Sequence, residues 1–159
     1  MREIGLNALI AIAFAWAFEW MSPLGLGIGA AVGFVVVGFG QAALGETWYL
    51  RRARAWVRLI VMFHYELIVS SVDVAVDVLT PRHRANPAII DVPLDVKSDL
   101  GILLVSNLIS LTPGTLSLDI SEDRRTLRVH AMFADDPDAL CKSLKSGMES
   151  WVIDAVEGA

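Results

Sequence analysis

The chain has 159 residues, of which 55% are apolar and 19% charged, with a mean hydropathy of +0.55 and a formal net charge of −5. This length and composition favour a membrane anchor followed by one small soluble domain. The acidic balance argues against nucleic-acid binding, which requires a basic surface. The single cysteine, Cys141, excludes a disulfide framework and a cysteine-rich metal site.

Two uncharged runs near the N-terminus predict a membrane hairpin over residues 1–50, with spans at about 4–21 and about 24–45. Ser22-Pro23 separates the runs, because proline lacks an amide hydrogen and disfavours a helical residue before it. Apolar sequence resumes directly after this break, which disfavours a cleaved signal peptide.

Gly25, Gly29 and Gly33 recur at four-residue spacing in the second span and form one face, called the glycine face below. Small residues at this spacing let the backbone of another helix approach closely, so we expect the face to be a helix-packing interface. The alternative is that these glycines reflect only the high glycine content of membrane helices.

A cluster of positive charge follows the second span, at Arg51, Arg52, Arg54 and Arg58. Short arginine-rich flanks are usually retained in the cytoplasm, which predicts that both termini are cytoplasmic. Residues 51–80 are therefore expected to form this cluster and an amphipathic helix on the membrane surface.

Residues 59–79 are apolar but carry a narrow stripe of polar side chains, called the acidic stripe below. It consists of Glu66, Ser70, Asp73 and Asp77. A buried aspartate in a membrane helix is costly, so the stripe should face water or a protein partner and is a candidate docking surface. A third membrane span, a merely solvated face and a proton path are the alternatives; the span would place the arginines outside.

After a linker, residues 81–159 predict a small cytoplasmic α+β domain in the order β-α-β-β-α. Pro93 suggests that the first strand lies at a sheet edge, and Ser98 can cap the following helix. The expected apolar face of that helix consists of Leu100, Leu103, Leu104, Leu108 and Leu111. The expected buried side of the last helix, which starts at Asp136-Pro137, consists of Leu140, Leu144, Met148, Trp151, Val152 and Ala155.

A structural turn is predicted between the first helix and the second strand of this domain, at Thr112, Pro113, Gly114 and Thr115. Proline fixes the entry of such a turn and glycine supplies a positive φ. No spacing of nucleophile and base, metal ligands or phosphate-binding glycines is present, so the sequence predicts no enzyme, no cofactor and no metal site.

The order of these parts resembles the E subunit of the multi-subunit Mrp, Mnh or Pha monovalent cation/proton antiporters. The resemblance rests on the run from Ser106 to Asp119, which contains Asn107 and the threonine-proline-glycine-threonine turn, and on Leu127 to Ala131, which contains His130. It implies that Asn107 and His130 are structural residues. Ser106 and Ser110 are small departures from the family pattern.

The resemblance implies an accessory, non-translocating subunit of a hetero-oligomeric sodium/proton antiporter in the bacterial plasma membrane. Its partners would be other antiporter subunits and membrane lipid, and it would have no small-molecule substrate of its own. In such complexes, ion movement is attributed to larger subunits. The alternative is a free-standing membrane-anchored domain that binds a cytoplasmic ligand or protein.

Overall fold

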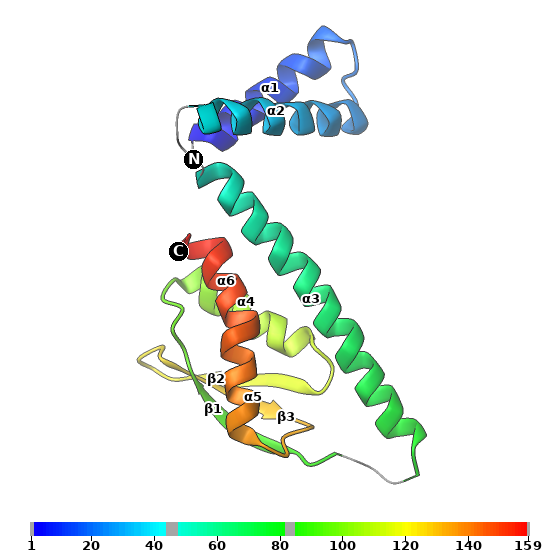
Figure 1. Cartoon of the computed structure of the whole chain (residues 1–159), viewed down its shortest axis with the longest axis vertical. Coiled ribbons are helices and arrows are strands. Elements are labelled where there is room, and N and C mark those ends of the chain that lie inside the picture. The colour runs from blue at the N-terminus through cyan, green and yellow to red at the C-terminus, as the bar shows by residue number, and fades with distance from the viewer. Residues whose placement is uncertain (1, 44–47, 82–84, 159) are drawn as a thin grey trace. The chain divides into compact units, whose positions relative to one another are not determined.

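The computed structural model describes residues 2–43, 48–81 and 85–158, and the chain separates into two compact units, Met1–Ala53 and Arg54–Ala159. Figure 1 shows their helices and strands. The end of the expected second span, at 44–45, and most of the expected linker, at 82–84, lie outside the described residues.

The first unit contains a helical hairpin of α1 (Arg2–Ala17) and α2 (Pro23–Ala43). At 1.5 Å per residue these helices are about 24 Å and about 32 Å long, so α2 alone matches a hydrocarbon core of about 30 Å. At the start of α2 the Ser22 hydroxyl accepts a hydrogen bond from the Gly25 amide at 3.1 Å. Ser22-Pro23, where the sequence predicts a helix break, therefore lies in the connection between two helices that pack against each other.

Helix α3 (Trp48–Leu79) is continuous over 32 residues. By length and composition alone, α2 and α3 are the described helices that could cross a membrane. From Arg54 onward, α3 belongs to the second unit. The sequence alone suggested a domain starting at 81, and the difference arises because Leu59 of α3 is only 4% exposed and lies in the core of the domain.

The rest of the second unit is an α+β fold. Its elements are β1 (Ala88–Pro93), α4 (Asp99–Leu111), β2 (Thr115–Ile120), β3 (Thr126–Ala131), and a last helix built from α5 (Pro137–Leu144), η1 (Lys145–Glu149), α6 (Ser150–Val152) and η2 (Ile153–Glu157). The three strands are antiparallel in the order β1-β3-β2, so β1 with Pro93 lies at an edge. The sequence pattern predicts this order of strands and helices.

One face of the sheet is buried by α4 and the last helix, and the other face is exposed. The core consists of Leu59, Ile90, Val92, Val96, Ile102, Val105, Ile109, Leu127, Val129, Leu144, Met148, Trp151, Val152 and Ala155. All of the last helix's expected buried residues belong to this core except Leu140, which packs against it partly buried.

The buried face of α4 differs from the expected one. Ile102, Val105 and Ile109 enter the core, whereas Leu100, Leu103 and Leu111 are more than half exposed. The expectation was wrong for these three leucines, whereas Leu104 and Leu108 pack against the core partly buried. Apolar residues occur on every side of this helix, so their spacing does not single out one face. Packing against the sheet selects the face with the two isoleucines and the valine.

Candidate functional site

The glycine face of α2 lies against α1 of the same hairpin. A Cβ atom added at Gly29 would lie 2.6 Å from the carbonyl oxygen and 2.9 Å from the Cα of Ala11. A Cβ at Gly25 would collide with the backbone of Trp20, and one at Gly33 with the side chain of Asn7. The close approach expected at these glycines is made within the chain, so this face is occupied before any neighbouring protein is considered.

Asn7 is a polar residue within this hairpin that the sequence reasoning missed. Its side-chain amide donates a hydrogen bond to the Tyr49 hydroxyl at 2.8 Å. Its carbonyl oxygen, Oδ1, is buried against Gly33 and has no hydrogen-bond partner among the described residues. A lone asparagine in an apolar run is the sequence signal that identifies such a contact, because polar groups in membrane helices require partners.

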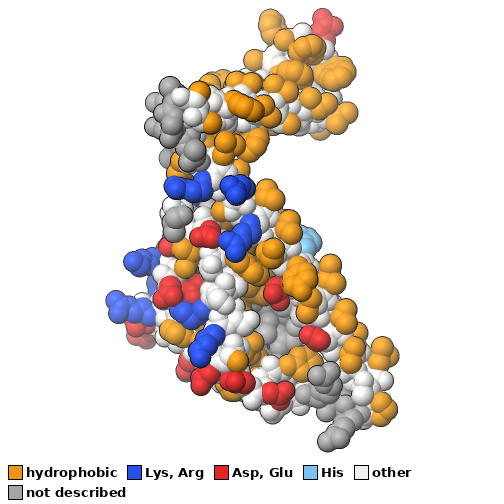
Figure 2. All heavy atoms as spheres, in the orientation of Figure 1, with side chains coloured by type: hydrophobic (Ala, Val, Ile, Leu, Met, Phe, Trp, Pro, Cys, Tyr) orange, Lys and Arg blue, Asp and Glu red, His pale blue; other side chains and the backbone are white. Residues whose placement is uncertain are grey.

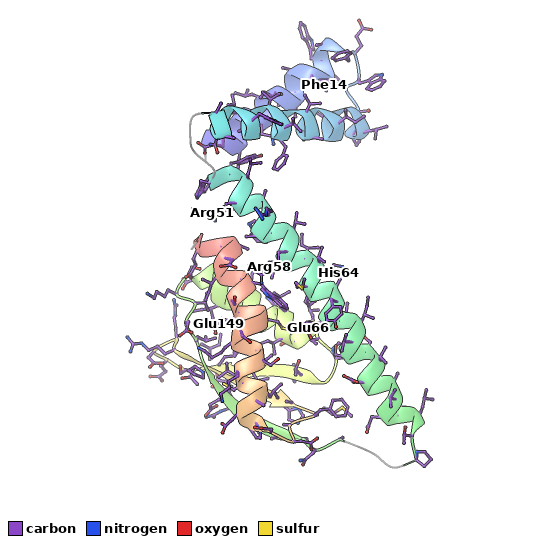
Figure 3. All side chains as sticks on the ribbon, in the orientation of Figure 1. Phe14, Arg51, Arg58, His64, Glu66 and Glu149 are labelled. Atoms are coloured by element: carbon purple, nitrogen blue, oxygen red, sulfur yellow. The ribbon has the colours of Figure 1, made fainter. Side chains whose placement is uncertain are left out.

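The acidic stripe of α3 faces the α+β domain. Glu66 and Ser70 line a cavity of about 170 Å³ whose other walls are the turn at 112–115, Phe133 and the last helix. Figure 3 shows Glu66 on the side of α3 nearer the domain and His64 on the opposite side. The Ser70 hydroxyl donates to the Glu66 carbonyl oxygen at 2.6 Å, which satisfies this group within the helix.

The other half of the stripe lines a second cavity, of about 160 Å³. Its walls include Asp73, Asp77, Phe133 and Asp135. Asp77 is only 2% exposed. Among the described residues, no three His, Cys, Asp or Glu side chains are grouped so that they could hold a metal ion. The two cavities together place all four residues of the acidic stripe on the side of α3 that faces the chain's own domain.

The turn at 112–115 connects α4 to the sheet and closes the first cavity. Gly114 has φ of +89°, which confirms the expected positive angle. The Thr115 hydroxyl donates to the Ile109 carbonyl oxygen at 2.6 Å, and the Thr112 hydroxyl donates to that of Leu108 at 2.8 Å. The Gly114 carbonyl oxygen accepts from the Met132 amide at 2.7 Å, which joins the turn to the end of β3.

Two glutamates of the last helix bind the segment 95–98, which follows β1 and is called the glutamate-bound segment below. Glu149 is 2% exposed, and its carboxylate accepts from the Asp95 amide at 2.5 Å and the Val96 amide at 3.1 Å. Glu157 accepts from the amides of Lys97 and Ser98, both at 2.8 Å. The sequence reasoning missed both glutamates, because a glutamate on a helix is interpreted as facing water unless its distant partner is known.

Hydrogen bonds and charges around this segment shift two pKa values. Hydrogen bonds from the backbone amides of Ser98 and Lys97 hold the pKa of the Glu157 carboxyl below its usual value. Burial acts to lower the pKa of Lys145, but Asp95, at 2.8 Å, and Glu149, at 3.5 Å, outweigh it and raise that pKa. Both shifts favour the charged forms of Glu157 and Lys145.

The remaining candidates lie apart from these contacts. His130 is on the exposed sheet face, opposite Ile89 of β1 and Leu116 of β2. Asn107 is exposed on α4, and Cys141 is half-buried near the core. The structure therefore does not bring His130, Asn107 and Cys141 together into one site.

Comparison with known proteins identifies the family. A family model described as a Na+/H+ ion antiporter subunit matches residues 9–155. The chain is 31% identical over 155 residues to the E subunit of the Na(+)/H(+) antiporter of Alkalihalophilus pseudofirmus, with 98% of each chain covered. It is 32% identical over 142 residues to the corresponding E subunit of Bacillus subtilis, covering 88% of this chain and 90% of that one.

Two solved structures are similar as well. A chain of the Mrp complex from Dietzia sp. has a TM-score of 0.51 and 30% identity, covering 64% of this chain and 94% of that chain. A chain of the membrane-bound sulfane sulfur reductase, an archaeal respiratory membrane complex, has a TM-score of 0.59 and 21% identity with 98% of both chains covered, and it shows likeness of fold alone. The family match begins within α1 and covers the rest of the hairpin, α3 and nearly all of the domain. The chain therefore belongs to the family of Na+/H+ antiporter E subunits.

Proposed function

We propose that this chain is a non-translocating accessory subunit of a multi-subunit sodium, or other monovalent cation, proton antiporter in the bacterial plasma membrane. Its role is to support assembly and activity in cation extrusion and pH homeostasis. The family match over residues 9–155 is the observation that carries the proposal. The relatives are named as antiporter subunits, and one similar chain belongs to an Mrp complex, so we propose other antiporter subunits as its partners.

The positions of the ionisable groups support the non-translocating part. Moving protons or cations through a membrane requires polar or ionisable groups at membrane depth. Within the expected spans 4–21 and 24–45, Glu19 is the one ionisable residue, and it lies at the break between the helices. The carboxylates of the acidic stripe line cavities on the soluble domain. We therefore assign ion movement to other subunits and place both termini in the cytoplasm, beside the arginine cluster.

The free-standing alternative predicts that residues 80–159 fold and bind without the rest of the chain. The core argues against this, because Leu59 is one of its members and Ala55 packs against it. In addition, Arg58 of α3 forms an ion pair with Asp154 of the last helix at 3.5 Å. A domain cut at 80 would lose this side of its core.

The test is purification of the tagged full chain from its native membrane in mild detergent, with mass spectrometry of the co-eluting chains. Several large antiporter subunits in fixed ratio support the proposal, whereas elution alone or with a soluble protein contradicts it. Antiport measured in inverted membrane vesicles tests the non-translocating role separately from membership of the complex. Glu66→Gln with Asp73→Asn should lower the amount of assembled complex and leave the ratio of cations to protons unchanged, and a changed ratio would refute the non-translocating role.

A further inference from the structure

The polar and apolar sides of helix α3 are placed in the opposite way to those of a surface helix in a soluble protein. Its charged stripe residues face the domain, whereas the side that points away is mostly apolar, with His64 as a polar residue on it. Exposed residues of this outer face, with their exposed fractions, are Val57 60%, Ile60 53%, Val61 54%, Ile68 65%, Val72 55%, Val78 67% and Leu79 82%. Figure 2 shows hydrophobic side chains along this edge of the helix. An exposed apolar surface of this length marks a contact with lipid or protein.

The domain meets α3 at separate points along its length in the second unit, at Leu59 in the core, at Glu66 beside the first cavity and at Asp77 beside the second. Leu59 is buried near one end and Asp77 near the other, and about 27 Å of helix separates them. This distance is close to the thickness of a hydrocarbon core, about 30 Å. If α3 crossed the membrane, the domain would enter the lipid with it. Residues 80–159 carry eight basic and twelve acidic side chains, which makes that position prohibitively costly.

The occupant of the outer face is indicated by what surrounds it. The apolar residues of the outer face overlap the end of the arginine cluster at 51–58 and continue beyond it, and guanidinium groups bind the phosphates of lipid headgroups. Tyr65 of α3 is 60% exposed. Amphipathic rings of this kind are enriched at the level of the headgroups.

We propose that the outer face of α3 lies in the plane of the membrane, with its apolar side chains at the boundary between the headgroups and the acyl chains of the cytoplasmic leaflet. The domain then lies on the aqueous side of α3, and the acidic stripe is on that same side, with Asp77 buried and Asp73 exposed to water. This inference does not depend on the ion exchanged or on the other subunits, because it uses only the polarity of α3 and the packing of the domain.

The test measures the membrane depth of single nitroxide labels in the full chain with Cys141→Ala. Labels replace Val61, Ile68 and Val72, which are exposed, and Glu122 in the turn between β2 and β3 serves as a matched aqueous control. The protein is reconstituted in vesicles of phosphatidylethanolamine and phosphatidylglycerol. Accessibility to oxygen and to a water-soluble nickel chelate then gives the depth of each label.

The proposal predicts that the three outer-face labels share one shallow depth, about 5–10 Å below the headgroups, and that the label at Glu122 is in water. A spanning helix would instead change the depth by about 16 Å between Val61 and Val72, which would overturn the proposal. Water-like accessibility at all three positions would overturn it as well. The same labels in the complex purified from native membranes test whether a neighbouring protein, instead of lipid, covers the outer face. Protection from both reagents would show such a protein and refute lipid contact.

Discussion

Replacing Gly29 with alanine should open the hairpin, whereas the same change at Gly27 should not. A Cβ at Gly29 would lie 2.6 Å and 2.9 Å from backbone atoms of Ala11, which cannot rotate away as a side chain can. At Gly27 a Cβ meets nothing within 4 Å. Overpacking in a close contact costs about 1–3 kcal/mol, while alanine improves helix propensity over glycine by about 1 kcal/mol at both positions. The hairpin with Gly29→Ala should therefore be less stable than that with Gly27→Ala by about 2 kcal/mol.

Thiol labelling within the hairpin measures this difference. Ala15 of α1 is 0% exposed, so Ala15→Cys in a Cys141→Ala background places a protected thiol in the hairpin. When opening is fast relative to labelling, the labelling rate follows the population of the open form. A difference of about 2 kcal/mol corresponds to labelling about 30-fold faster in Gly29→Ala than in Gly27→Ala. Equal rates in the two variants would refute the assignment of α1 as the partner of the glycine face.

Three further predictions concern the domain, measured by urea unfolding of the full chain in detergent. Glu149→Ala leaves the partly buried amide of Asp95 and the buried amide of Val96 without an acceptor and should lower the free energy of unfolding by about 3 kcal/mol; Glu149→Gln, which keeps an acceptor oxygen, should lose less, and equal losses would contradict this account. Because the folded-state pKa of Glu157 lies below its ordinary value of 4.5, its contribution is present above about pH 4.5 and is lost as the pH falls through the lower folded-state pKa, so Glu157→Gln should remove this part of the acid dependence and an unchanged profile would count against it. Gly114→Ala should cost about 1–2 kcal/mol because φ is +89°, and Gly114→Asn should cost less, since asparagine tolerates positive φ.

Much of the fold follows from local signals in the sequence. Pro93, Ser98 and Gly114 each mark a position whose backbone has one favourable solution: an edge strand, a helix start and a turn with positive φ. The breaks at Ser22-Pro23 and Asp136-Pro137 likewise mark helix starts. Such signals act over a few residues, so no knowledge of distant partners is needed to interpret them.

The interactions that define the candidate site are not local. Glu149 is 53 positions from Val96, and the sequence between them gives no indication that the pair will meet. The same limit applies to Leu59, whose place in the core depends on the last helix. The sequence predicts that the residues of the acidic stripe share one face of a helix. Sequence periodicity does not show which neighbour that face contacts.

The dependence of the glutamate-bound segment on the last helix sets an order for biogenesis. The ribosome completes α1 and α2 early, and their contacts lie close together in the chain, so the hairpin can form while translation continues. The domain cannot complete its folding until Glu149 and Glu157 have been synthesised, because these residues bind the glutamate-bound segment after β1. We therefore expect a nascent chain stopped before Glu149 to be attached to the membrane with an unfinished domain, open to membrane-bound proteases until translation ends.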